Sequence, residues 1–130
     1  TSDDLSVLVA DDSPINQEVA LGMLELKGYR AQAVSDGREA VEAFTNGSFA
    51  VILMDLEMPN MDGLAATAEI RRLETESGRP RTPIVALSAH AVNDVQEKCL
   101  DADMDGYVPK PIRPDQLFEA LERLIASSVE

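Results

Sequence analysis

Residues 50–55 read AVILMD, an uninterrupted apolar run that ends at the carboxylate of Asp55. Two more stretches follow nearly the same plan, since residues 5–12 read LSVLVADD and residues 83–88 read PIVALS. Strands of parallel sheets are covered on both faces and are therefore apolar along most of their length. The three runs predict the following parallel strands: Leu5–Ala10, Ala50–Met54 and Pro83–Leu87.

Two shorter segments, Tyr29–Val34 and Gly106–Pro109, have the residue types of further strands. Between and after the strands, apolar residues recur every three or four positions, which predicts five helices. Those positions are Ile15, Val19, Met23 and Leu26, then Ala40, Val41 and Phe44, then Leu64, Ala68 and Leu73, then Val92, Val95, Cys99 and Ala102, and finally Leu117, Leu121, Leu124 and Ile125. Five strands that alternate with five helices predict an α/β fold built on a parallel sheet.

Capping residues predict where the helices begin and end. Ser13 is a candidate N-cap in front of Pro14, and Gly28 is a stop signal after the first helix. The longest polar stretch, Thr75–Thr82, is predicted to be a loop. Further helix starts are expected at Asp36, with Glu39 at the spacing of a capping box, at Asp62 and at Pro114.

The size and charge of the chain limit what it can be. Its 130 residues, 45% hydrophobic and 27% charged, suit one globular domain. The single cysteine, Cys99, cannot form an internal disulfide, which fits a reducing cytoplasm. The net charge of −13 disfavours direct contact with nucleic acid or with an anionic membrane. No apolar run approaches the ~20 residues of a membrane span.

Polar side chains follow the predicted strands and are expected to meet at one edge of the sheet. Asp11 and Asp12 follow the first strand, Asp55 the third and Ser88 the fourth, and the fifth runs into Lys110. Neighbouring carboxylates repel one another unless a cation neutralises them, and Mg²⁺ prefers such oxygen ligands. An ammonium group and a hydroxyl would bind further anionic oxygens. This set of side chains indicates a site for the transfer of a phosphoryl group.

Five separate motifs resemble the receiver domain of the response regulators of two-component signalling. They are Asp11-Asp12, MDLEMP at 54–59, MDG at 61–63, ALSA at 86–89 and PKP at 109–111. Their agreement in order over about residues 5–125 is a much stronger signal than any one of them. The resemblance implies that residues 1–130 form a single receiver domain. Its fold would be the CheY-like, flavodoxin-like (βα)5 fold: a five-stranded parallel sheet in the order 2-1-3-4-5 with helices on both faces.

The resemblance also implies a role for each site residue. Asp55 would be the phosphoacceptor, which attacks phosphorus and becomes an acyl phosphate. Mg²⁺ (or Mn²⁺) would be bound by Asp12, by Asp55 and by the backbone carbonyl of Glu57, with Asp11 holding a metal-bound water. Lys110 would pair with Asp55 before phosphorylation and with a phosphoryl oxygen afterwards.

Two further residues would form the switch that the family uses. The hydroxyl of Ser88 would move to the phosphoryl group, and Tyr107 would turn inward in response. The change would be displayed by the face made of the fourth helix, the fifth strand and the fifth helix.

Three stretches, residues 75–82, 88–91 and 97–100, resemble the receivers of hybrid sensor histidine kinases in particular. This implies that the phosphoryl group comes from, or passes to, a histidine of a kinase or of a histidine-phosphotransfer domain. The absence of an initiator methionine also favours a domain excised from a longer chain. We expect this domain to lie in the cytoplasm, including the case in which the parent chain is anchored in a membrane. A stand-alone response regulator is the alternative.

Two other classes of function use an α/β domain of this kind. A phosphatase of the haloacid-dehalogenase type would carry an Asp two residues after its nucleophile, whereas Asp11 and Asp12 are adjacent and Ser13 follows. A pseudo-receiver, which binds partners without being phosphorylated, is suspected where an acidic residue or the lysine is lost. This chain keeps Asp55 and Lys110, so we expect a phospho-receiver and rank the pseudo-receiver second.

Overall fold

The computed structural model describes residues 6–47, 49–56, 58, 61–79, 81–88, 104–109 and 112–129. The helix predicted from Val92, Val95, Cys99 and Ala102 lies outside these residues. The described strands are β1 (Ser6–Ala10), β2 (Arg30–Val34), β3 (Val51–Asp55), β4 (Ile84–Ser88) and β5 (Gly106–Pro109). The described helices are α1 (Pro14–Leu26), α2 (Gly37–Asn46), α3 (Gly63–Ser77) and α5 (Pro114–Val129).

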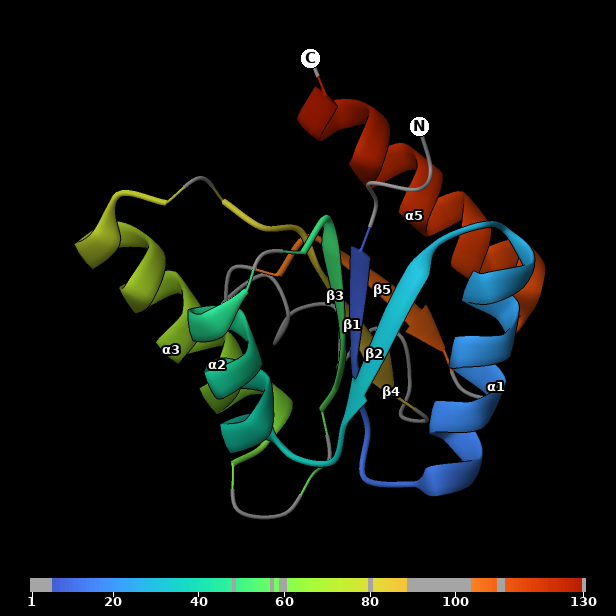
Figure 1. Cartoon of the computed structure of the whole chain (residues 1–130), viewed down its shortest axis with the longest axis horizontal. Helices are drawn as coiled ribbons and strands as arrows, with labels where there is room; N and C mark the ends of the chain where they lie inside the picture. Colours follow the sequence, from blue (N-terminus) through green and yellow to red (C-terminus); the bar gives the residue numbers. More distant parts are fainter. Residues whose placement is uncertain are drawn as a thin grey trace.

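The five strands form one parallel sheet in the order β2-β1-β3-β4-β5, which confirms the predicted fold class and strand order. Helices α1 and α5 cover one face of this sheet, and α2 and α3 cover the other (Figure 1). The strand order changes direction between β1 and β3, and ligands of such sheets bind beside the carboxyl ends of the strands at that point.

Alternate residues of the central strands feed two separate cores, because successive side chains point to opposite faces of a sheet. Val7, Val9 and Leu53 pack toward α1 and α5, together with buried Leu24, Leu117 and Leu121. Leu8, Ile52 and Met54 pack toward α2 and α3, together with buried Phe44 and Ile70. Burial of each large aliphatic side chain contributes about 1.5–3 kcal/mol, so both helical layers hold the sheet firmly.

The predicted helix starts are confirmed by their hydrogen bonds. The side chains of Ser13, Asp36 and Asp62 accept from backbone N–H groups at the starts of α1, α2 and α3, at 3.4, 2.8 and 2.8 Å. The capping box at α2 differs in one detail, since the Glu39 carboxylate accepts from Ser35 N rather than from Asp36 N. Acidic caps of this kind satisfy the otherwise unpaired N–H groups of the first turn.

Helix α3 runs further than its sequence indicates. Thr75 and Ser77, which we expected in a loop, are helical, and their hydroxyls donate to the carbonyls of Arg71 and Leu73 four residues earlier. The helix ends only at Gly78, whose φ of 69° is the left-handed conformation that glycine adopts without strain. The polar composition of this turn reflects an exposed helix end rather than a break.

Helix α1 buries a different face from the one its apolar spacing suggests, whereas α3 departs from its predicted face at one position only. On α1 the buried residues are Ala20 and Leu24, whereas Ile15 is 72% and Leu26 87% exposed. On α3, the predicted positions Leu64 and Leu73 are half-buried against the core, whereas Ala68 is exposed; the fully buried apolar residues are Ala66 and Ile70. Helix α5 follows the prediction, with Leu117 and Leu121 fully buried. Small buried residues such as alanine carry little apolar signal, so a more apolar exposed stripe can obscure the packed face.

Candidate functional site

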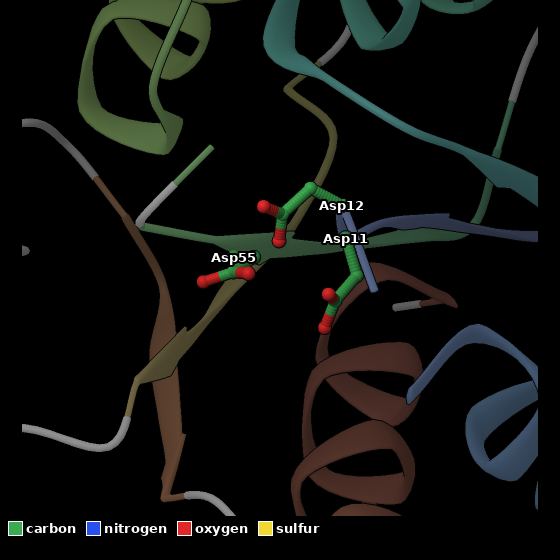
Figure 2. A group of neighbouring side chains, drawn as sticks. All are labelled: Asp11, Asp12 and Asp55. Atoms are coloured by element: carbon green, nitrogen blue, oxygen red, sulfur yellow. The ribbon is translucent and has the colours of Figure 1, made fainter. Parts of the chain in front are cut away.

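Three aspartates meet at the carboxyl ends of β1 and β3. The strands pair with Ala10 beside Met54, so Asp11, which follows Ala10, comes level with Asp55 at the end of β3. One carboxylate oxygen from each of Asp11, Asp12 and Asp55 lies within 4.8 Å of the others. Figure 2 shows the three side chains gathered around one small space. The meeting of these three carboxylates at one edge is as predicted.

The loop after β1 is shaped by the first of these aspartates. Asp11 N donates to Val34 O at 3.1 Å, which continues the pairing with β2 by one residue. The Asp11 carboxylate then accepts from Ser13 N at 2.9 Å, a local turn that leads the chain into α1. Asp11 is fully buried, whereas Asp12 is exposed. The two adjacent aspartates therefore present one buried and one exposed carboxylate to the site.

The third aspartate is held by the backbone on both sides of it. Leu56 N donates to Leu87 O at 3.1 Å and extends the pairing of β3 with β4 past Asp55. Gly63, the first residue of α3, packs directly on the Asp55 backbone, and any Cβ there would overlap the Asp55 carbonyl oxygen. Asp55 itself is 1% exposed. Its side chain thus starts from a backbone position with little freedom.

A second backbone contact lies beside this one. Gly37 N, in the first turn of α2, donates to Met61 O at 2.9 Å, and a Cβ on Gly37 would overlap that same oxygen. Met61 lies just before α3, so the starts of α2 and α3 are linked through the loop that follows β3. Glycine at both positions permits an approach that no side chain allows.

The predicted switch residues lie side by side on β4 and β5. Ser88 is the last residue of β4, is 2% exposed and pairs with Pro109. Tyr107 is half-buried, and its hydroxyl donates to the Ser88 carbonyl at 3.4 Å. Both residues therefore border the same edge of the sheet as Asp55. The predicted site residues Glu57 and Lys110 lie outside the described residues.

The cluster of three carboxylates fits a small divalent cation. Two of the carboxylates are buried, and anionic groups so close together repel one another strongly unless a positive charge lies between them. Oxygen ligands lie about 2.0–2.1 Å from Mg²⁺, hence up to about 4.2 Å from one another, and a water-bridged ligand lies further out. The spacing of these oxygens, within 4.8 Å, suits direct and water-mediated ligands of one ion.

A parallel five-stranded sheet in this order, with three carboxylates beside its switch point, defines a receiver-type domain. Residues 7–122 match the family model of the response regulator receiver domain. The chain therefore belongs to the response regulator receiver family of two-component signalling.

Curated proteins similar to this chain include histidine kinases. The chain is 36% identical over 129 residues to hybrid signal transduction histidine kinase I of Dictyostelium discoideum, covering 95% of this chain and 7% of that protein. It is 41% identical over 115 residues to the sensor protein GacS of Pseudomonas syringae, covering 88% of this chain and 13% of GacS. The chain spans only 7–14% of the length of such relatives.

Two solved structures similar to this chain are receiver domains that were determined with a metal ion or with a partner protein. The receiver domain of the sensor histidine kinase PA1611 from Pseudomonas aeruginosa, solved with magnesium coordinated in its active-site cleft, is 39% identical. Its TM-score is 0.84, and the match covers 94% of this chain and 98% of that one. The receiver of Ssk1 from Saccharomyces cerevisiae, solved with the histidine phosphotransfer protein Ypd1, is 25% identical with a TM-score of 0.90, covering 98% and 93%. Across the described residues, no helix combines the length and the apolar character needed to span a bilayer.

Proposed function

We propose that residues 1–130 act as one phospho-receiver domain, which accepts a phosphoryl group from a phosphohistidine onto Asp55. The observation that carries this proposal is the meeting of Asp11, Asp12 and Asp55 within 4.8 Å at the switch point of the sheet. Asp55 ends the central strand β3, and Asp11, which directly follows β1, lies level with it. An oxygen of the Asp55 carboxylate forms the new bond to phosphorus while the phosphorus–nitrogen bond of the donor breaks, and the imidazole nitrogen takes up a proton.

The residues that hold Mg²⁺ in this proposal are Asp12, Asp55 and the backbone carbonyl of Glu57, with Asp11 acting through a water. Mn²⁺ has the same preference for oxygen ligands and would suit the same site. When bound, the ion neutralises the carboxylates and the oxygens of the incoming phosphoryl group. Lys110 follows Pro109, which pairs with Ser88 at the same sheet edge, and it supplies a second positive charge to those oxygens.

The switch in this proposal uses Ser88 and Tyr107. The Ser88 hydroxyl donates to a phosphoryl oxygen on Asp55, and Tyr107, whose hydroxyl donates to the Ser88 carbonyl, turns inward in response. The response is then displayed by β5, α5 and the segment that precedes β5.

The donor or acceptor of the phosphoryl group is, in this proposal, a histidine kinase or a histidine-phosphotransfer domain, and the domain works in the cytoplasm as part of a hybrid sensor kinase. The similarity to kinase receivers and to a receiver in complex with a phosphotransfer protein supports this. The exposed apolar residues Ile15 and Val19 lie in the first turns of α1, which begins two residues after Asp12. They provide an apolar surface next to the carboxylates on which such a partner can dock.

Intact-mass spectrometry after incubation with acetyl phosphate tests the chemistry directly. We expect one added phosphate that requires Mg²⁺, is absent with EDTA and is absent in Asp55→Asn. The matched control is Asp36→Asn, which changes the same side chain outside the cluster and keeps the helix cap, because Asn caps as well as Asp. It should be phosphorylated like the wild type.

The same experiment tests the pseudo-receiver. Stoichiometric phosphorylation of Asp55→Asn would contradict the assignment of the phosphoacceptor. No added phosphate on the wild type, together with no binding of beryllofluoride, would replace the proposal with a pseudo-receiver that acts through its surface alone.

A further inference from the structure

The side chain of Gln17 reaches from α1 back to the ends of two strands. Its amide nitrogen Nε2 donates to the Asp11 carbonyl at 2.6 Å and to the Val34 carbonyl at 3.1 Å. The same nitrogen lies 3.3 Å from the hydroxyl oxygen of Ser35. A single carboxamide thus joins the carboxyl end of β1, the carboxyl end of β2 and the second turn of the helix between them in sequence.

The short hydrogen bond to the Asp11 carbonyl has a consequence for the next residue. That carbonyl belongs to the planar peptide group between Asp11 and Asp12, so holding its oxygen fixes the plane of the group. The plane fixes the position of the Asp12 Cα and the direction of its N–Cα bond, from which the Asp12 side chain starts. Asp12 is the exposed member of the carboxylate cluster, and packing therefore restrains it less than it restrains buried Asp11 and Asp55.

Val34 strengthens the same arrangement. Its carbonyl accepts from Gln17 Nε2 and also from Asp11 N at 3.1 Å, so the peptide groups on both sides of Asp11 are tied to the end of β2. Second partners of this kind orient the groups that bind a metal, and their loss typically weakens metal affinity by about 10–100-fold.

We propose that Gln17 is a positioning residue for the cation site: its carboxamide aligns the Asp11–Asp12 peptide group so that the Asp12 carboxylate faces Asp55. This inference rests on the proposed function, because it assumes that the three carboxylates bind Mg²⁺. It adds a residue that touches neither the ion nor the phosphoryl group and acts only through Asp12.

Isothermal titration calorimetry of the purified domain with MgCl₂ tests this role. Gln17→Met keeps the length of the side chain but removes its donor, and we expect it to weaken Mg²⁺ binding about tenfold. Gln17→Ala removes the same donor and introduces the residue with the highest helix propensity. It should weaken Mg²⁺ binding by the same factor, which excludes poor packing of the methionine side chain as the cause. The matched control is Gln32→Met on the exposed side of β2, which should bind Mg²⁺ within twofold of the wild type.

A double variant separates positioning from a merely structural role. If Gln17 acts through Asp12, Gln17→Met should have little further effect on Mg²⁺ affinity in an Asp12→Asn background, because coupled residues are not additive. Thermal unfolding in EDTA reports the structural contribution of Gln17 separately.

Three results would overturn the inference. A Mg²⁺ affinity within twofold of the wild type in Gln17→Met and Gln17→Ala would reduce Gln17 to a structural link, even if the unfolding temperature fell. A full, additive loss in the Asp12→Asn background would show that Gln17 does not act through Asp12. Wild-type protein that does not bind Mg²⁺ at all would overturn the proposed metal site together with this inference, whereas the first two results leave the metal site intact.

Discussion

Gly63 shows how a residue without a side chain contributes to the site. It lies at the first position of α3 with its backbone against the carbonyl of Asp55, and it is fully enclosed there. Gly63 is not required by a left-handed backbone conformation, because its φ is not positive. What it provides is proximity: the helix can begin next to the backbone of the proposed phosphoacceptor.

We predict that Gly63→Ala destabilises the domain by about 1–3 kcal/mol, since the added methyl group must displace backbone rather than a flexible side chain. It should also slow phosphorylation of Asp55, whose backbone has to move. Urea unfolding and the acetyl phosphate assay measure the two effects.

Gly22→Ala is the matched control for this change. A Cβ on Gly22 meets nothing within 4 Å, and alanine is favoured over glycine in a helix by about 1 kcal/mol. The same substitution on α1 should therefore stabilise the domain and leave phosphorylation unchanged. Equal effects of the two substitutions would contradict the role given to Gly63.

The site residues differ in how far the sequence could predict them. Asp11, Asp12 and Asp55 are predictable because each follows or ends an apolar run, and parallel strands bring their carboxyl ends to one edge. Gln17 is not predictable in this way. Its contacts depend on how α1 lies over the end of β2, which no local spacing encodes.

At the scale of the elements, α1 carries two apolar stripes, and only one of them belongs to the core. Ala20 and Leu24 are buried, while Ile15, Val19 and Leu26 form an exposed stripe on another side of the helix. Periodicity correctly predicts that this segment is a helix but does not say which stripe faces the sheet. Strand prediction meets no such ambiguity here, because β1, β3 and β4 are buried on both faces.

The exposed stripe of α1 leads to a prediction about partner binding. Ile15→Glu should slow phosphotransfer from a phosphorylated histidine-phosphotransfer domain roughly tenfold or more, since a charge in the centre of an apolar contact typically costs more than 1 kcal/mol. It should leave phosphorylation by acetyl phosphate unchanged, because a small donor needs no docking surface. Rates of phosphotransfer from each donor measure the difference.

Leu26→Glu serves as the control, since Leu26 is even more exposed but lies at the far end of α1 from the carboxylates. We expect Leu26→Glu to leave the ratio of the phosphotransfer rates from the two donors unchanged. A loss of reactivity with acetyl phosphate in Ile15→Glu would mean that the substitution disturbs the site itself. This result would contradict the proposal that Ile15 lies on the docking surface.

At the scale of the whole molecule, a network of ion pairs and hydrogen bonds around Arg71 lies at the end opposite the carboxylates. Its guanidinium bonds to Glu74 at 2.9 Å, to Asp105 at 2.7 Å and to the Thr82 carbonyl at 2.8 Å. Arg81 adds a second ion pair to Asp105. The network thereby ties α3 to the residues that precede β4 and β5.

We predict that Arg71→Met lowers the free energy of unfolding by roughly 2–3 kcal/mol, because it leaves two mostly buried carboxylates without this partner. Phosphorylation of the folded protein should not change, since the network lies at the amino ends of the strands. Chemical denaturation, followed by the acetyl phosphate assay well below the transition, checks both statements.

Arg72→Met provides the contrast on the same helix. Arg72 pairs with Glu69 and Glu76 on the exposed surface, and such pairs add little to stability. Its removal should change the unfolding midpoint far less than Arg71→Met. A comparable loss in both variants would show that the Arg71 network is no more than a set of surface charges.

The fold as a whole was predictable from the chain, and its longest-range contacts were not. Three apolar runs and their helical spacers are sufficient to predict a parallel α/β sheet, because few other arrangements bury them. The pairing of Arg71 with Asp105 joins residues far apart in sequence, and charged residues of this kind occur equally on open surfaces. Only the folded chain, which brings Arg71 on α3 next to Asp105 just before β5, distinguishes the two cases.

Two glycines, Gly63 against Asp55 and Gly37 against Met61, make the flank of the sheet with α2 and α3 stiff. Where the backbone of a glycine lies directly on another backbone, as at Gly37 and Gly63, the glycine itself has no side chain that could rotate to absorb a displacement. The flank with β4 and β5 meets the site through Ser88 and Tyr107, whose contact involves a rotatable side chain and is therefore compliant. In the proposed phospho-receiver, strain introduced at Asp55 by phosphorylation would accordingly be relieved on the compliant flank, so that the response would be directed toward β4 and β5.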